Sequence, residues 1–150
     1  MGMVFIKQLN GLVEDKVMFI NLLSSIEKKA LMSLLVNISK ADGNLSDSEI
    51  DFLKTYASEN NIEFNIDNKG VPTIEDACCE INSHKGKVVA IQEIIKLAIV
   101  DGHYDESERA GAIFISELLH LPLSKFEEIE AWVLDGEHWV SRGVQLLAEA

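Results

Sequence analysis

The sequence predicts an all-α protein, an internally duplicated helical bundle of about seven to eight helices in a pseudo-twofold arrangement. Apolar residues recur at helical spacing through most of the chain, and no strand-like alternation flanked by turn residues is present. In addition, one acidic stretch occurs twice, at residues 42–49 and 101–108, with every position 59 residues apart. Such self-similarity indicates two copies of one unit, which must pack together to bury their apolar faces.

Each copy of the acidic stretch is predicted to join two helices. In the first copy, Gly43 follows a periodic apolar run, and glycine readily adopts the left-handed conformation that ends helices. Ser46 and Glu49 then form an S-x-x-E capping box, in which both side chains satisfy N–H groups at the next helix start. Asp105 and Glu108 have the same places in the second copy. Each unit therefore reads as helix, turn, helix.

We expect a single domain over residues 1–150. It is divided into an N-terminal arm (1–23), repeat one (24–61), a polar connector (62–72), repeat two (73–120) and C-terminal helices (124–150). The arm has the weakest helical pattern.

Capping signals and glycines set the expected boundaries inside these parts. Three capping pairs are predicted to begin helices: Ser24 with Glu27, Thr73 with Asp76, and Ser124 with Glu127. Gly86 is expected to precede a core helix over 87–101. Gly136 is expected to separate a helix that ends at Leu134 from a last helix that starts at Glu137.

Some side chains of the C-terminal helices also have expected environments. The acidic run 127–130 is interpreted as a solvated helix face. Trp132 and Trp139, seven positions apart, are predicted to pack in the core, with a groove for a partner protein as the alternative.

The charge and composition restrict the class of partner. A net charge of −12 and a pI near 4.6 argue against nucleic acid and against an anionic membrane surface, which both reward basic patches. They suit cations or basic protein partners. No secretory signal and no apolar run of about 18 residues is present, so we expect a cytoplasmic protein without direct membrane insertion.

The two cysteines, Cys78 and Cys79, are adjacent, and neighbouring residues do not easily reach disulfide geometry. We expect a reduced compartment, with one buried and one half-buried thiol on a helix. A redox or soft-metal role for the pair is the alternative.

Four carboxylates are the candidate metal ligands: Asp42, Glu49, Asp101 and Glu108. Both aspartates follow a predicted helix, where the negative end of the helix dipole makes a carboxylate unfavourable by about 0.3–1 kcal/mol. A bound cation would compensate, and hard oxygen donors suit Ca²⁺, Mg²⁺ or Mn²⁺. The alternative is that the glutamates only cap helices and the aspartates stay solvated. The spacing is not that of an EF-hand loop.

The residues around both turns resemble the TerB-like family, which is associated with tellurite resistance. Residues 40–49, KADGNLSDSE, resemble the family signature ADG-x-[IL]-S-x-x-E, and residues 100–109 resemble its second-half counterpart. Residues 121–133 resemble the family's tail, so the resemblance covers roughly 24–134.

This resemblance implies an all-helical duplicated domain with an acidic face suggested to bind divalent cations. It carries over Asp42 and Glu49 from the first signature, and Asp101 and Glu108 from the second. It also implies a role in stress responses through protein partners, including membrane-associated components of the same system.

Three functional classes follow, in order of preference. The first is a binding or scaffold protein, not an enzyme, whose acidic face holds a divalent cation or a basic partner. The second is an ion-free structural module for protein–protein interaction. The third is a metal-assisted hydrolase, for which the sequence offers no nucleophile motif and no phosphate-binding loop. The sequence does not indicate the oligomeric state.

Overall fold

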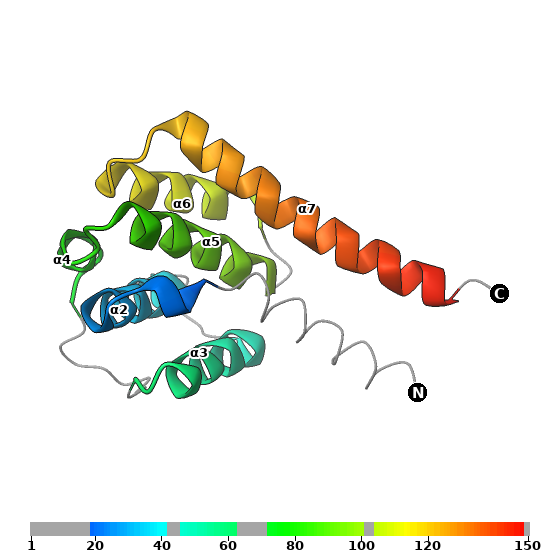
Figure 1. Cartoon of the computed structure of the whole chain (residues 1–150), viewed down its shortest axis with the longest axis horizontal. Helices are drawn as coiled ribbons and strands as arrows, with labels where there is room; N and C mark the ends of the chain where they lie inside the picture. The colour runs from blue at the N-terminus through cyan, green and yellow to red at the C-terminus, as the bar shows by residue number, and fades with distance from the viewer. Residues whose placement is uncertain (1–18, 42–45, 63–71, 101–103, 149–150) are drawn as a thin grey trace.

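The computed structural model describes residues 19–41, 46–62, 72–100 and 104–148 (Figure 1). Its elements are a short 3₁₀ helix and six α-helices: η1 (Ile20–Leu22), α2 (Ser25–Ala41), α3 (Asp47–Glu59), α4 (Ile74–Cys79), α5 (His84–Val100), α6 (Glu106–Leu118) and α7 (Leu123–Ala148). No strand occurs in these residues, so the all-α prediction is confirmed.

Helix α5 is at the centre of the bundle. It lies between α2 and α6 in Figure 1 and also packs against α3, α7 and η1. Its apolar side chains are nearly inaccessible to solvent: Val89, Ala90, Ile91, Ile94, Ile95 and Leu97. The high apolar density of this segment reflects its contact with neighbours on several sides, as expected for a core helix.

The helix bounds repeat with the same offset as the acidic stretches. Helices α2 and α5 each have 17 residues, and α3 and α6 each have 13. Corresponding helices start 59 positions apart, as the acidic stretches do. The pseudo-twofold relation between the two pairs stays a prediction.

Four of the five predicted capping pairs begin helices as expected. The pair of Ser124 with Glu127 does not, because α7 already starts at Leu123, where the Pro122 carbonyl accepts the N–H groups of Lys125 and Phe126. Ser46 and Glu49 form a reciprocal capping box at α3, with both hydrogen bonds at 3.1 Å. The N–H of Glu108 donates to Asp105 Oδ1 at α6, at 2.9 Å. The Thr73 hydroxyl accepts from the Asp76 N–H at 3.2 Å and begins α4.

Two glycine boundaries are wrong. The chain runs through Gly136 as one helix of 26 residues, α7, because a helical backbone accommodates glycine at a cost of about 1 kcal/mol relative to alanine. Gly86 lies inside the first turn of α5 instead of before it. The Ser83 hydroxyl accepts the Gly86 N–H at 2.9 Å and sets the earlier start.

The tryptophan prediction is also wrong for Trp139, which is 68% exposed. Trp132 is 40% exposed, and its ring lies beside Phe19 with centroids 6.1 Å apart. The buried residues of α7 are Phe126, Ile129 and Val133, all in its first half. Beyond them the helix extends past the other described helices (Figure 1).

The cysteine environments differ in part from expectation. Cys78 is buried, whereas Cys79 is exposed instead of half-buried. The pKa of the Cys78 thiol is raised to about 11, mainly by burial and to a smaller extent by the charges of Cys79 and Glu75. That thiol is therefore protonated near neutral pH, which disfavours a redox or metal-binding role for it. Among the described helices, none combines the length and apolar character needed to cross a membrane.

Candidate functional site

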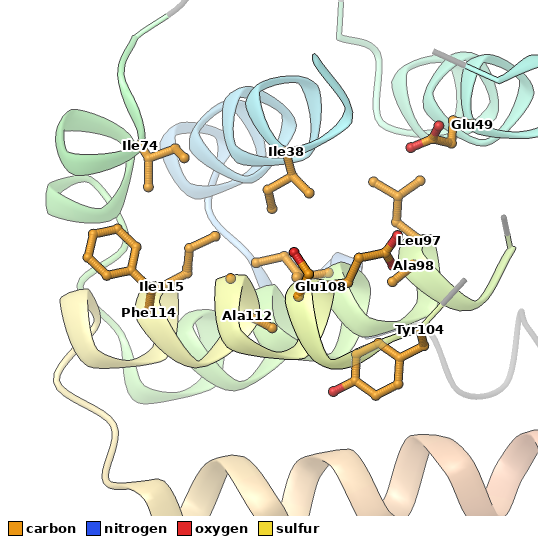
Figure 2. Close-up of a pocket in the computed structure, with 13 residues that line it drawn as sticks. Ile38, Glu49, Ile74, Leu97, Ala98, Tyr104, Glu108, Ala112, Phe114 and Ile115 are labelled. Carbon is orange, nitrogen blue, oxygen red and sulfur yellow. The ribbon is translucent and has the colours of Figure 1, made fainter. Parts of the chain in front are cut away.

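The candidate site is a pocket of about 220 Å³ between the two helix pairs (Figure 2). Most of its wall is apolar: Ile38 from α2, Ile74 from α4, Ile94, Leu97 and Ala98 from α5, and Gly111, Ala112, Phe114 and Ile115 from α6. Its polar lining consists of Glu49, Tyr104, Ser107 and Glu108. Pockets of this kind, apolar with a few convergent polar groups, are the usual form of a binding site.

The two repeats each supply one glutamate to this pocket. Glu49 lies in the first turn of α3 and Glu108 in the first turn of α6, and Figure 2 shows them on different walls. Both are partly buried. The partial positive charge at a helix N-terminus favours an acidic side chain at each place. The packing of the repeats therefore brings the two equivalent glutamates to one cavity.

The capping box holds Glu49 in position. Its Oε1 accepts the Ser46 N–H at 3.1 Å, while its own N–H donates to Ser46 Oγ. A carboxylate has about four acceptor positions, so this bond leaves Oε2 able to accept from a ligand. Capping and ligand binding are thus compatible for this side chain.

The aspartates of the predicted metal set, Asp42 and Asp101, lie outside the described residues, as do both D-G turns. The pocket therefore brings together Glu49 and Glu108 from the predicted set of four. In the part of the chain that the structure describes, no group of three or more His, Cys, Asp or Glu side chains is arranged to hold a metal ion. The four-carboxylate ligand set stays a prediction.

A polar cluster behind the pocket ties it to α7. The Tyr104 hydroxyl donates to Glu130 Oε2. Arg109 binds the same carboxylate in bidentate fashion, with Nε to Oε2 at 2.8 Å and Nη2 to Oε1 at 3.1 Å. The guanidinium also lies 5.6 Å from the centre of the Phe126 ring. These contacts hold Tyr104, a pocket wall, in a defined orientation.

The charge states in this cluster follow from its contacts. Burial alone would raise the pKa of Glu130, but hydrogen bonds from Arg109 and Tyr104 and the Arg109 charge lower it below its ordinary value. Burial and the hydrogen bond to Glu130 raise the pKa of Tyr104. The cluster therefore consists of a carboxylate, a guanidinium and a neutral phenol near neutral pH.

Sequence reasoning missed this cluster and misread Glu130, which is partly buried rather than fully solvated. Its neighbours Glu127 and Glu128 are exposed as predicted. Glu130 lies among the buried residues Phe126, Ile129 and Val133, so its position in the sequence already indicates the side of α7 that faces the bundle. Nothing in the local pattern identifies Arg109 and Tyr104 as its partners.

The fold and the pocket together define a small all-helical domain, in which two pairs of helices of matching lengths surround an acidic, apolar-walled cavity. The family model described as "Tellurite resistance protein TerB" matches residues 28–131 of the chain. Because this match covers more than half of the sequence, the protein belongs to the TerB family, as the residues around the two turns predicted. Comparison with curated proteins and with solved structures gave no match.

Proposed function

We propose that this chain is a tellurite-resistance-associated binding or scaffold protein that acts through protein partners and holds a divalent cation beside the pocket. The observation that carries the proposal is that Glu49 and Glu108, at equivalent positions of the two repeats, line the same cavity. The family assignment supports the tellurite-related role.

The cation part of the proposal rests on ligand chemistry. Ca²⁺, Mg²⁺ and Mn²⁺ prefer carboxylate oxygens, and the chain carries a net charge of −12. Asp42 and Asp101 each precede one of the two glutamates by seven positions. They are the further ligands that we propose. A cation at this place would relieve the repulsion between the acidic groups of the two repeats.

The cation proposal has a direct test in thermal unfolding of the full chain with millimolar Ca²⁺ or Mn²⁺. A ligand that binds only the folded state stabilises it by about 2.7 kcal/mol at a hundredfold excess over Kd. We therefore expect a rise in melting temperature that Asp42→Asn combined with Asp101→Asn removes. Glu108→Gln should also reduce the rise. Glu106→Gln should not, because Glu106 is exposed in the same first turn and does not line the pocket.

The alternative, an ion-free interaction module, is favoured by the capping role of Glu49. The two proposals differ for Glu49→Gln, because glutamine also serves in a capping box. If Glu49 only caps, this variant should behave as the parent with and without ions. Absence of any ion-induced rise in the parent chain would leave the interaction module as the function.

We propose binding rather than catalysis because the pocket wall is mainly apolar. A metal-assisted hydrolase would need a base beyond the metal ligands. The described lining offers Tyr104, whose hydroxyl is bound to Glu130, and Ser107, with no histidine or lysine among the lining residues. Membrane-associated partners are part of the proposal on the strength of the family resemblance alone.

A further inference from the structure

The pocket has more apolar surface than a metal ion uses. A divalent cation is held by oxygen atoms, and the aliphatic walls of α2, α4 and α5 supply none of them. Deep in the cavity, Ile94, Leu97 and Ile115 are almost completely buried, whereas Phe114 is 48% exposed. The wall is therefore apolar at its base and open to solvent beside Phe114. This shape suits a molecule with an apolar body.

We propose that the pocket binds a small organic cation, an apolar body of single-ring size that carries one primary amine, with its ammonium group at Glu49 and Glu108. This inference rests on the proposed binding function and names a ligand class for the same pocket. It commits to a free small molecule as the occupant.

The volume of the cavity sets the size of the ligand. An apolar cavity of about 150 Å³ accommodates benzene. The pocket here is about 220 Å³, which leaves room for a ring and a short aminoalkyl group. The body would contact Ile38 and Ile74 on one side and Ala112 and Ile115 on the other (Figure 2).

The polar lining sets the charge of the ligand. Both ionisable carboxyl groups of the lining come from glutamate, and among the described lining residues there is no lysine, arginine or histidine. Oε2 of Glu49 is able to accept an N–H from an ammonium group, because the capping bond uses Oε1. Charge-assisted hydrogen bonds of this kind are about twice as strong as neutral ones, so the lining should favour an amine over a neutral or anionic isostere.

The pocket is also largely preformed. Tyr104 is held by its hydroxyl on Glu130, and that carboxylate is held in turn by Arg109. Glu49 is held by Ser46. A ligand would therefore order few side chains on binding, and the loss of conformational freedom that opposes association would be small.

The test compares three probes of one size on the full chain: benzylamine, benzyl alcohol and benzoate. Binding is measured by calorimetry and by shifts of methyl NMR signals. We expect benzylamine to bind about tenfold or more tightly than benzyl alcohol, with benzoate weakest. Shifts should concentrate on pocket methyls such as those of Ala112 and Ile115. Equal binding of amine and alcohol, or shifts elsewhere in the chain, would overturn the inference.

Two glycine variants separate this inference from the proposed cation site. An added Cβ meets no atom within 4 Å at Gly111, which lines the pocket, or at Gly136, which does not. Gly111→Leu should add an apolar side chain to the pocket lining and weaken benzylamine binding about tenfold or more, while the Ca²⁺-induced rise in melting temperature persists. Gly136→Leu should change neither.

Glu49→Gln completes the set, since it keeps the cap but removes the charge. We expect this variant to bind benzylamine no better than benzyl alcohol. Amine binding without any response to Ca²⁺ would refute the cation site and leave this inference standing. A response to Ca²⁺ without amine binding would refute this inference and leave the cation site standing.

Discussion

At the scale of single residues, Glu27 joins the two repeats through one buried carboxylate, 7% exposed. Its Oε1 accepts the Ser24 N–H at 3.1 Å in the capping box of α2. Its Oε2 accepts the Ser83 N–H at 3.2 Å and the Ser83 hydroxyl at 2.6 Å. Ser83 is also the residue whose hydroxyl accepts from Gly86 at the start of α5. One side chain therefore fixes two helix starts against each other.

The repeat explains why Gly86 occupies the position in the second unit that Glu27 occupies in the first. Ser24 and Ser83 are 59 positions apart, and so are Glu27 and Gly86. A Cβ at Gly86 would lie 2.3 Å from Glu27 Oε2. The second unit thus lacks the glutamate of its own capping box and makes room for the carboxylate of the first unit.

Replacement of Glu27 should cost far more stability than replacement of Glu49, although both belong to capping boxes. In the parent protein, both carboxylate oxygens of Glu27 accept backbone N–H groups. In Glu27→Gln, the amide NH₂ would replace one of these oxygens and face an N–H donor. A buried unsatisfied donor costs about 1–3 kcal/mol. In Glu49→Gln, the cap persists and the change should be within about 0.5 kcal/mol. Denaturant unfolding at pH 7 measures the free energy of unfolding of both variants. Equal losses of stability would contradict the proposal that Glu27 holds the starts of α2 and α5 together.

The difference in free energy of unfolding between Glu27→Gln and the parent should also depend on pH. Burial alone would raise the pKa of Glu27, but hydrogen bonds from Ser83 and Ser24 lower it below 4.5. A lowered folded-state pKa means that the stabilisation is complete above the unfolded-state pKa and is lost as pH falls through the folded-state value. The stability gap should therefore narrow below about pH 4.5. A gap independent of pH would show that the carboxylate charge is not involved.

At the scale of elements, α7 combines a packed half with an exposed half. The helix has 26 residues and is about 39 Å long at 1.5 Å per residue. Its early turns bury Phe126, Ile129 and Val133, whereas Trp139, Leu146 and Leu147 are exposed. The later half therefore gains little from tertiary packing among the described residues, and its helicity depends on local propensity.

Gly136→Ala should stabilise the protein. An added methyl group at this position meets no atom within 4 Å, and alanine is favoured over glycine in a helix interior by about 0.5–1 kcal/mol. Far-UV circular dichroism and denaturant unfolding measure the helix content and the free energy of unfolding. Gly86→Ala is the matched control and should have the opposite sign, because its methyl group would clash with Glu27. A destabilised Gly136→Ala variant would mean that the glycine is required by a contact outside the described residues.

At the scale of the whole molecule, the family match covers most of the buried core. The matched residues 28–131 run from α2 into the first half of α7. Among the described residues, the last buried one is Val133. All residues that line the pocket fall within the matched range, and they lie on or next to α2, α3, α4, α5 and α6.

Removal of residues 137–150 should therefore leave a folded protein with one cooperative unfolding transition. The truncation deletes no residue of the described core, so its effect on the free energy of unfolding should stay within about 1 kcal/mol. Differential scanning calorimetry measures the transition, and benzylamine binding should be unchanged. Loss of cooperativity would show that the end of α7 is part of the folding unit.

The range of an interaction explains why some contacts were predicted and others missed, although the local helix-boundary signals at Ser124, Gly86 and Gly136 were wrong. Capping pairs such as Ser46 with Glu49 were predicted correctly because both partners lie within three residues. The second partner of Glu27 and the pairing of Arg109 with Glu130 were missed, because these contacts join separate helices. The buried ion pair of Glu93 with Lys96, at 3.4 Å within α5, was not expected in a segment so apolar.

The sequence by itself determined the helical class, the two repeated units and the family, since periodicity, capping and a fixed 59-residue offset are properties of the chain written in one dimension. Only the tertiary structure decided that Glu49 and Glu108 share a cavity and that its walls are apolar. The physical reason is that these outcomes depend on how far one helix lies from another, and packing of side chains across helices sets that distance.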